Sequence, residues 1–591
     1  MESSNSMSNN RDIDKKADAI YYGGPILTMV KDDDRAEALA VQNGHIMAVG
    51  TREEVMANKG PQTKLIDLKG KALLPGFFDP HSHVVLQSAK FITANLDPKP
   101  IGNVESIADI QRILREWIQE KQLKPGQIVI GWGYDDTGLA ERRHPNRKDL
   151  DAVSTENPIL LLHISCHFMT ANSKMLEDAG ITAQTQNPEG GVIQRFPGGN
   201  EPNGVLEEAA MSLIGKKIPA MSPERAMEML ENGLHAYAEA GITTAQDCAT
   251  FKGTWRLLAE MEKQGRLPID VIAWPLYKGV DDAAFETIAA KRGSFGRLRF
   301  GGIKLVMDGS IQGYTALLSK PYHVLPKAVE PVADNCNAQQ AHQLFVDTKH
   351  TEAKSAVSAS PYGQDYCGYA GMPQEDIETW LKRCDDNGLQ VQVHGNGDGA
   401  VDMLIKAVEK VRGKNARPDL RTAIIHAQTM RDDQLDFAAK HGLTPSFFPI
   451  HVYFWGDRHR DLFLGPQRAE RIDPARSALN RNLKITLHHD APVAGIGMIN
   501  VVWSAVNRIT SSGKPLGPEE RITPFEAFRA ITADAAWQNF EEHRKGTLET
   551  GKLADMVVLS DDPLRVAPME IRDIRVLQTI KEGETVYALQ G

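Results

Sequence analysis

The chain has 591 residues, of which 41% are hydrophobic and 24% are charged. These proportions are typical of a soluble globular protein with a sizeable core, and the length predicts one large body with an appendage. Its 67 basic and 77 acidic side chains give a net charge of -10 without a long basic run, which argues against nucleic acid and anionic membranes as partners.

The cysteines and the N-terminal segment indicate a reducing compartment. Cys166, Cys248, Cys336, Cys367 and Cys384 are odd in number and form no CxxC pair, so neither a disulfide framework nor a thiolate zinc site is predicted. Residues 1–16 are polar and lack an apolar signal segment, and no stretch reaches the roughly 18 apolar residues of a membrane span. We expect a disordered tail on a cytoplasmic protein.

Both ends of the chain have the pattern of short strands between turn residues. Residues 17–75 contain AIYYGGPILTMV and AEALAVQNGHIMAVG, and residues 545–591 contain GKLADMVVLS and ETVYALQG. Glycine, asparagine and aspartate bound these runs. We expect the two ends to pair into one β-domain.

Between the ends, residues 76–544 alternate strand-like and helix-like runs. The eight strand candidates are LLPGFFDPHSH, GITTAQD, IDVIAWP, GGIKLVMDG, LQVQVHGNG, RTAIIHAQ, GLTPSFFPI and LKITLHHDAP. Residues 223–240, 254–265 and 400–413 have helical spacing of apolar side chains. This alternation predicts an α/β protein with a (β/α)₈ TIM barrel. Segments 88–222 and 321–372 are too long for ordinary loops and are expected as inserts over the barrel mouth.

The residues with metal-binding chemistry share one position, at or just past the C-terminal end of a predicted strand. They are His81, His83, Lys304, His394, His426 and Asp490. Barrel enzymes build their active sites on this face. Imidazole and carboxylate hold divalent zinc, and a pair of such ions turns water into a nucleophile. The sequence therefore predicts a metallohydrolase.

Each of these assignments has a plain structural alternative. Two histidines as close as His81 and His83 are often satisfied by neighbouring polar groups, although on an extended segment both rings can hold one ion. Lys304 would ordinarily be a surface lysine or half of an ion pair. Beside two cations, its neutral amine can instead take up carbon dioxide and bridge them as a carbamate. For His488 and His489 we expect packing or ligand-supporting roles.

Nine segments after residue 17 resemble those of one known family and occur in its order. They are LLPGFFDPHSH, GWGYDD (131–136), HFMTANS (167–173), GVLEEAA (204–210), IKLVMDGSIQGYTALL, VQVHGNGDGA, IIHAQ, HHDAPV and GTLETGKLADMVVLSDDPL. Together they are much more specific than any one motif. On these segments the chain resembles the amidohydrolase superfamily and, within it, the N-substituted formamide deformylase-like branch.

The resemblance implies a distorted barrel, a β-sandwich built from both termini, and two divalent metal ions. Zinc is the expected metal, and manganese, iron or cobalt would suit the same ligands. The family pattern assigns His81 and His83 to one ion, His394 and His426 to the other, and carboxylated Lys304 to the bridge. The chain departs from the pattern where His488 and His489 replace Gly-Ser and where the segment after the fourth strand is longer.

The implied reaction is hydrolysis of an amide-type C–N bond by a hydroxide held between the metals. Asp490 is the expected general acid/base, which takes the proton and passes it to the leaving nitrogen. His167 is a candidate donor to the oxyanion, although an ordinary polar role is nearly as good an explanation. Candidate substrate-binding residues are Trp132, Tyr134, Phe168, Tyr314, Tyr453, Phe454 and Trp455, for which simple packing is the alternative.

The expected partner is a small amide-type molecule: a formamide, longer amide, carbamate, urea or cyclic imide. A homodimer is compatible with an exposed sheet edge. One rival function is a metal-dependent isomerase or decarboxylase, because a metal-polarised carbonyl also stabilises an enolate. A non-catalytic pseudoenzyme would be favoured by missing ligands, and all six positions are present.

Overall fold

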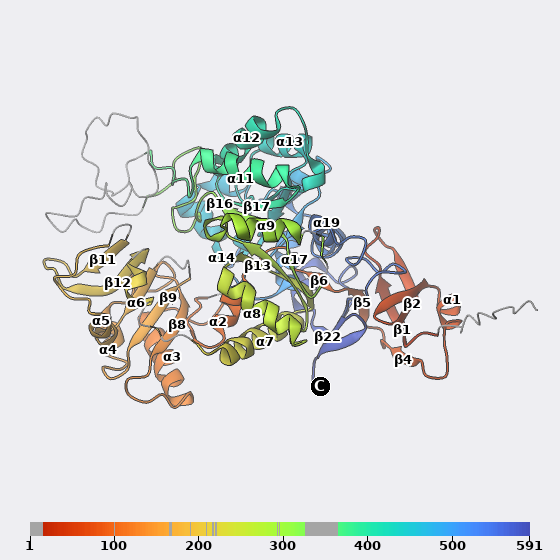
Figure 1. Cartoon of the computed structure of the whole chain (residues 1–591), viewed down its shortest axis with the longest axis horizontal. Helices are drawn as coiled ribbons and strands as arrows, with labels where there is room; N and C mark the ends of the chain where they lie inside the picture. Colours follow the sequence, from red (N-terminus) through yellow and green to blue (C-terminus); the bar gives the residue numbers. More distant parts are fainter. Residues whose placement is uncertain are drawn as a thin grey trace, which may run out of the picture.

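The computed structural model shows an α/β protein with several sheets (Figure 1), the class predicted from the sequence. It describes residues 16–99, 101–164, 168–188, 191–208, 210–215, 218, 221–291, 293–294, 296–325 and 365–590. The expected tail up to residue 15 and residues 326–364 of the second expected insert lie outside the described residues. Over the described ranges, every helix is too short or too polar to cross a bilayer.

The two ends of the chain meet in one sheet. Its strands run in the order β23 (Glu584–Ala588), β22 (Val576–Lys581), β21 (Met556–Leu559), β5 (Ala72–Pro75), β1 (Ala19–Leu27), β2 (Arg35–Gln42) and β3 (His45–Gly50), with β4 (Lys64–Asp67) beside β1. The antiparallel pair β5 and β21 places Leu74 opposite Val557, so backbone hydrogen bonds join the two ends. One face buries Leu39 and Met556, and the other packs Ile20 against helix α1 (Arg52–Met56).

Two hairpins of this sheet have the turn residues that their geometry requires. Asn43 and Gly44 connect β2 to β3 with φ of 50° and 75°, and Glu582 and Gly583 connect β22 to β23 with φ of 51° and 80°. Two successive positive φ angles define the turn whose twist matches that of the flanking strands. Each turn therefore fixes the register of its hairpin.

Two parallel sheets form the centre of the molecule. The first has the order β15 (Leu298–Phe300), β14 (Asp270–Pro275), β13 (Ile242–Thr250) and β6 (Phe77–Phe78), and the second has β16 (Gly302–Val306), β17 (Gln390–Gly395), β18 (Ala423–His426), β19 (Thr444–Phe447) and β20 (Thr486–Leu487). They adjoin where Leu276 and Lys304 form a parallel bridge. Their strands are nearly all buried, which explains the continuous apolar runs in the sequence. The short strand β15 is absent from the sequence prediction because three residues carry too little periodicity.

Helices alternate with these strands and pack against them (Figure 1). They include α7 (Pro223–Glu239), α8 (Lys252–Lys263), α9 (Asp282–Ala290), α11 (Gln374–Asp386), α12 (Asp398–Arg412), α13 (Asp432–His441), α14 (Ile450–Arg458), α17 (Met498–Asn507), α18 (Pro524–Ala530) and α19 (Ala533–Gln538). Helix α7 starts where the Ser222 side chain accepts a hydrogen bond from the Arg225 backbone, with Pro223 in the first turn. Its Leu230 and Leu234, one turn apart, face the central core.

The first expected insert contains a sheet of its own. Its order is β11 (Gly191–Arg195), β12 (Pro202–Glu208), β10 (Phe168–Ala171), β9 (Ile159–His163), β8 (Val129–Tyr134) and β7 (Ala94–Asn95), accompanied by helices α3 (Ile107–Glu120), α4 (Arg147–Asp151), α5 (Ser173–Ala179) and α6 (Met211–Gly215). One ion pair fixes the chain where it enters this insert, and a second attaches the insert to the centre. Lys90, at the end of α2 (Val84–Lys90), lies 2.6 Å from Asp97, and Arg458, at the end of α14, lies 3.1 Å from Asp135.

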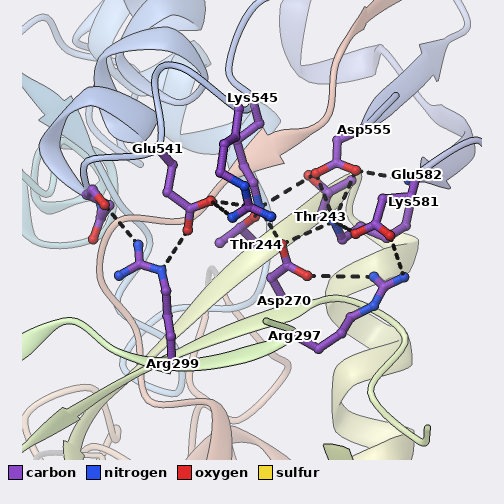
Figure 2. Close-up of polar contacts among 12 residues, drawn as sticks. Thr243, Thr244, Asp270, Arg297, Arg299, Glu541, Lys545, Asp555, Lys581 and Glu582 are labelled. Carbon is purple, nitrogen blue, oxygen red and sulfur yellow. Dashed lines mark hydrogen bonds and ion pairs between the residues drawn. The ribbon is translucent and has the colours of Figure 1, made fainter. Parts of the chain in front are cut away.

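A buried charge network joins the C-terminal segment to the beginnings of the parallel strands (Figure 2). Asp270, the first residue of β14, pairs with Lys545 and lies 3.1 Å from Lys581. Lys581 also lies 3.0 Å from Asp555, and Lys545 lies 3.3 Å from Glu541. Burial opposes ionisation of Asp270, but the two ammonium groups outweigh it and lower the pKa of this carboxyl to about 2.

We expect Asp270→Asn to destabilise the protein, because it leaves two buried lysines short of a counter-charge. The expected loss at neutral pH is about 3–5 kcal/mol, measured as a lower urea midpoint. Since the folded pKa of Asp270 lies below its ordinary value of 3.8, the stabilisation is complete above that value and is lost as the pH falls toward about 2. The variant should therefore lose less stability than the wild type over this acid range.

The matched control is Glu116→Gln, which removes the partner of exposed Arg112, 3.2 Å away on the surface of α3. Exposed pairs contribute little, so its urea midpoint should equal that of the wild type. Equal midpoints for Asp270→Asn and the wild type would contradict the stabilising role of the network.

Candidate metal centre

The parallel strands bring the six predicted donors to one end of the two central sheets. His81 and His83 follow β6, Lys304 lies within β16, His394 lies in β17, His426 ends β18 and Asp490 follows β20. Neighbouring parallel strands place their C-terminal ends side by side, so residues far apart in sequence become neighbours. Lys304 is the exception in position, since it occupies the middle of its strand.

Asp490 is the point on which three imidazoles converge. Its Oδ1 lies 3.4 Å from Nε2 of His81 and 3.4 Å from Nε2 of His83. Its Oδ2 lies 3.9 Å from Nε2 of His426. The donor atoms of His81, His83 and Asp490 all lie within 4.8 Å of one another, a spacing that one divalent ion can bridge with modest adjustment.

His394 and His426 form a second pair of rings beside this group. Their centroids are 4.6 Å apart, and the rings of His81 and His426 are 5.5 Å apart. His488, from the unusual pair before Asp490, has Nε2 3.2 Å from Nδ1 of His426. The ring of His488 therefore fixes the orientation of His426, as a ligand-supporting group does.

The other unusual histidine, His489, has a separate environment. Its Nε2 lies 3.4 Å from Oδ2 of Asp79, and its Nδ1 accepts a hydrogen bond from the Ala491 backbone. Asp79 also accepts a hydrogen bond from the His81 backbone. The two histidines thus support different parts of the centre.

The backbone at the centre adopts conformations that ordinary residues avoid. His426, Ala427 and Asp490 have φ of 71°, 50° and 51°. Left-handed backbone costs about 1–3 kcal/mol per residue and is found mainly where the surrounding structure imposes it, often at functional sites.

Burial and hydrogen bonds shift the pKa values of the donors in different directions. Burial opposes ionisation of Asp490, but hydrogen bonds from His81 and His83 hold the pKa of its carboxyl well below its usual range. Burial lowers the pKa of His81 to about 3 and that of His426 well below its ordinary value. At His83, burial also opposes protonation, but the hydrogen bond with Asp490 outweighs it and raises the pKa of this imidazole. At neutral pH the centre therefore offers a carboxylate and, at His81 and His426, uncharged imidazoles.

Lys304 is the clearest sign that this donor set needs a further group. Its Nζ is fully buried and makes no hydrogen bond with the described residues. Burial lowers the pKa of Lys304 to about 8, which makes the neutral amine accessible near physiological pH. An unpaired buried polar group costs about 2–7 kcal/mol. The donors therefore fit divalent metal ions, with Lys304 available as a modified ligand.

Two supporting groups escape the sequence analysis. Asp308, two residues after β16, accepts hydrogen bonds from Nδ1 of His394 at 3.0 Å and from the backbone of Asn396 and Gly397. The Cys248 carbonyl lies 2.6 Å from Nδ1 of His83. Both groups direct the other ring nitrogen toward the centre. Asp308 could have been predicted, because it is an acidic residue at the end of a predicted strand, in VMDGS. The Cys248 carbonyl could not, because a backbone carbonyl has no sequence signature.

A histidine–aspartate pair adjoins the centre and was also missed. Nδ1 of His451 lies 3.4 Å from Oδ1 of Asp473, and the rings of His451 and His426 are 6.2 Å apart. His451 is buried, and its hydrogen bond with Asp473 uses Nδ1, so Nε2 is the ring nitrogen that Asp473 leaves available. The pair can therefore offer an oriented ring nitrogen to a bound molecule.

The predicted substrate-binding aromatics fall into separate groups. Trp455 packs on Phe448 and His451, whose rings lie beside His426. Tyr134 and Phe168 pack on His144 and His163 of the insert, and Trp132 is nearly buried in β8. Tyr314 packs on Tyr322 and Phe463. Tyr453 contacts Phe454, with the two rings tilted by 49°, and Trp503. His167 lies outside the described residues.

Comparisons with known proteins agree with this geometry. A family model described as the amidohydrolase family matches residues 64–587. N-substituted formamide deformylase of Arthrobacter pascens is 26% identical over 587 residues, covering 97% of this chain and 99% of that protein. Two uncharacterized metal-dependent hydrolases have similar structures. The hydrolase from Pyrococcus horikoshii OT3 has a TM-score of 0.70 and 22% sequence identity, and the match covers 93% of this chain and 99% of that one. The hydrolase from Pyrococcus furiosus has a TM-score of 0.68 and 23% sequence identity, and the match covers 93% of this chain and 100% of that one.

The chain belongs to the amidohydrolase family. Within it, the chain lies in the N-substituted formamide deformylase-like branch. The resemblance predicted from the sequence motifs is therefore confirmed.

Asp308→Asn should weaken metal binding at His394, because the amide is a poorer partner for the ring N–H and for the two backbone donors. We expect metal affinity to fall by about 10–100-fold, measured by chelator competition on the stripped full-length protein. Asp436→Asn, which alters an exposed pair with Arg481, is the matched control. Unchanged affinity in Asp308→Asn would contradict the orienting role.

Proposed function

We propose that this protein is a metal-dependent amidohydrolase that cleaves the C–N bond of an N-substituted formamide or a related amide, carbamate, urea or cyclic amide. The observation that carries the proposal is the convergence of His81, His83 and His426 on the Asp490 carboxylate. The similarity to N-substituted formamide deformylase supports the substrate class. Formate, or another acid, and an amine would be the products.

His81 and His83 would hold one ion, His394 and His426 the other, and carboxylated Lys304 would join them. Zinc is the proposed metal, because uncharged imidazoles with one carboxylate suit it. When bound, the ions supply Lewis acidity that lowers the pKa of water and polarises a carbonyl. The buried, unpaired amine of Lys304 supports the carbamate, since both oxygens of that group would find partners there.

Asp490 would move the proton during the reaction. Its low pKa keeps it a carboxylate at neutral pH, ready to accept the proton of the attacking water. A bond then forms between the water oxygen and the carbonyl carbon of the substrate, while the π-electrons of the carbonyl move to the carbonyl oxygen. The electron pair on that oxygen then re-forms the carbonyl as the C–N bond breaks, and Asp490 returns the proton to the departing nitrogen, so that a neutral amine leaves.

His451 would bind the substrate oxygen. Asp473 would accept a hydrogen bond from Nδ1 of His451, beside the ring of His426. In the imidazolium form of His451, Nε2 would then be the nitrogen that donates to the substrate oxygen. A fixed donor strengthens its hydrogen bond as negative charge grows on the oxygen, so it favours the transition state. Trp455 and Phe448, which pack on His451, would supply an apolar wall for the N-substituent.

We also propose that the two parallel sheets are parts of one distorted (β/α)₈ barrel, capped by a β-sandwich from residues 17–75 and 545–591. On one side, the β-bridge between Leu276 and Lys304 supports contact between the two sheets. On the other side, the His83 backbone donates to Ala491, which follows the last strand. A barrel would explain why the donors occupy one rim.

The proposed activity is tested with metal-loaded protein and a panel of N-aryl and N-alkyl formamides, longer amides, carbamates and ureas, with amine release as the readout. Asp490→Asn should release amine about 10²–10⁴-fold more slowly, because the amide cannot accept the proton. Metal content is measured in parallel, so that loss of proton transfer is distinguished from loss of metal. No amine from any of these substrates, or full turnover by Asp490→Asn, would contradict the proposal.

His451→Ala should lower kcat by about 10²–10³-fold with a smaller change in KM, because the donor acts mainly on the developing charge. His441→Gln, at the end of α13 and stacked on Phe437, is the matched control and should keep wild-type kinetics. Steady-state rates on the best substrate of the panel check this. A change confined to KM would instead indicate a contact made equally in the ground state.

A further inference from the structure

A second cluster of metal-binding side chains lies in the insert, outside the candidate centre. Strands β8 and β9 run parallel, with Tyr134 opposite His163. Asp135 and Asp136 follow β8 directly, and His163 is the last residue of β9. The ends of two neighbouring parallel strands thus place two carboxylates and an imidazole together, by the same geometry that assembles the centre of the molecule.

The donors of this insert cluster, Asp135, Asp136 and His163, are close enough to share one ion. One donor atom from each lies within 4.8 Å of the others. Nε2 of His163 is 3.1 Å from Oδ1 of Asp136. Nε2 of His144 is 3.9 Å from Oδ2 of the same carboxylate, so a second imidazole stands beside the three.

Two of the three donors are buried, and the side chain of the third, Asp136, is 25% exposed. Asp135 is 5% exposed and His163 is 7% exposed. The rings of Tyr134, His144 and Phe168 surround His163, with centroids between 5.0 and 5.6 Å away. Water is thereby largely excluded from the imidazole and from Asp135.

The charges of the cluster favour a cation. Burial opposes ionisation of Asp135 and Asp136, but Arg458 beside the first and His163 beside the second hold the pKa of each carboxyl below its ordinary value. Burial lowers the pKa of His144 to about 4, so this imidazole is uncharged at neutral pH. Two carboxylates thus face one guanidinium, that of Arg458 at 3.1 Å from Asp135.

The imidazole of His144 is also held in place. Its Nδ1 lies 3.0 Å from the Tyr134 hydroxyl, which lies 3.0 Å from the Thr170 hydroxyl. Such a partner on the far nitrogen leaves Nε2 directed at Asp136 and is the usual support of a metal-bound histidine.

We propose that Asp135, Asp136 and His163 bind one divalent transition-metal ion of the zinc class, with His144 as a further ligand. Mixed imidazole and carboxylate donors suit such ions better than they suit magnesium or calcium. The ion would bind both the end of β8 and the end of β9. Because Asp135 also pairs with Arg458 of α14, the ion would stabilise the attachment of the insert next to the helix that carries His451.

The experiment measures zinc in the full-length protein after chelator treatment, dialysis against Zn²⁺ and removal of free ion. Asp136→Asn and His163→Gln should each hold one zinc per chain fewer than the wild type, while the remaining zinc keeps its affinity. His235→Gln, which replaces an exposed histidine of α7, is the control and should match the wild type. The wild type is expected to hold one zinc ion more per chain than these variants, whether or not the candidate metal centre also binds metal.

Folding is checked by the melting temperature without zinc, which should be the same for the variants and the wild type. Added Zn²⁺ should raise the melting temperature of the wild type by more than that of either variant. If one of these variants does not fold, the zinc content of the other variant and of His144→Gln tests the proposal instead. Equal zinc content in the wild type and the folded variants would overturn the proposal, as would equal zinc-induced shifts.

Discussion

The candidate centre depends on one constraint: polar groups that are buried must be paired. Asp490, His81, His426 and the amine of Lys304 are buried in the central sheets, and His83 beside them is partly buried. The carboxylate and rings partly satisfy one another, but Lys304 has no hydrogen-bond partner among the described residues. Such an arrangement is costly by itself and becomes favourable when cations complete it.

The opposite end of the strands satisfies the same constraint in a different way. There, Asp270 is matched by Lys545 and Lys581, and Asp555 and Glu541 complete the network (Figure 2). Every charge has a partner of opposite sign, so this end contributes stability and holds the C-terminal sheet to the centre. Barrel-like enzymes separate the two tasks along the strand direction, with chemistry at one end and stability at the other.

The insert is connected to the candidate centre through elements that begin there. Helix α2 starts directly after His83 and ends at Lys90, which pairs with Asp97 of the insert. Helix α14 carries His451 in its first turn and ends at Arg458, which pairs with Asp135. Both ion pairs are largely buried, so a shift of the insert would be transmitted to residues next to His83 and His426. The insert is thus positioned to influence the side of the centre that carries His451.

The sequence by itself determined the family, the α/β class and the positions of five donor residues at or after strand ends, whereas Lys304, expected at a strand end, lies in the middle of β16. These properties are local: apolar runs, turn residues and a metal-binding side chain at the end of a run are visible within about ten residues. The structure then placed the side chains of His81, His83, His426 and Asp490 together. The strand β15 and the six-stranded insert sheet were not predicted, because short strands carry weak periodicity.

Only the tertiary structure decided which groups support the donors. Asp308 and His394 are 86 residues apart, His451 and Asp473 are 22 apart, and Lys545 and Asp270 are 275 apart. No local pattern encodes such pairings, because they arise when separate strands and loops pack against a common core. The sequence supplies the donors, and the packing determines the orientation, burial and charge state that allow them to act together.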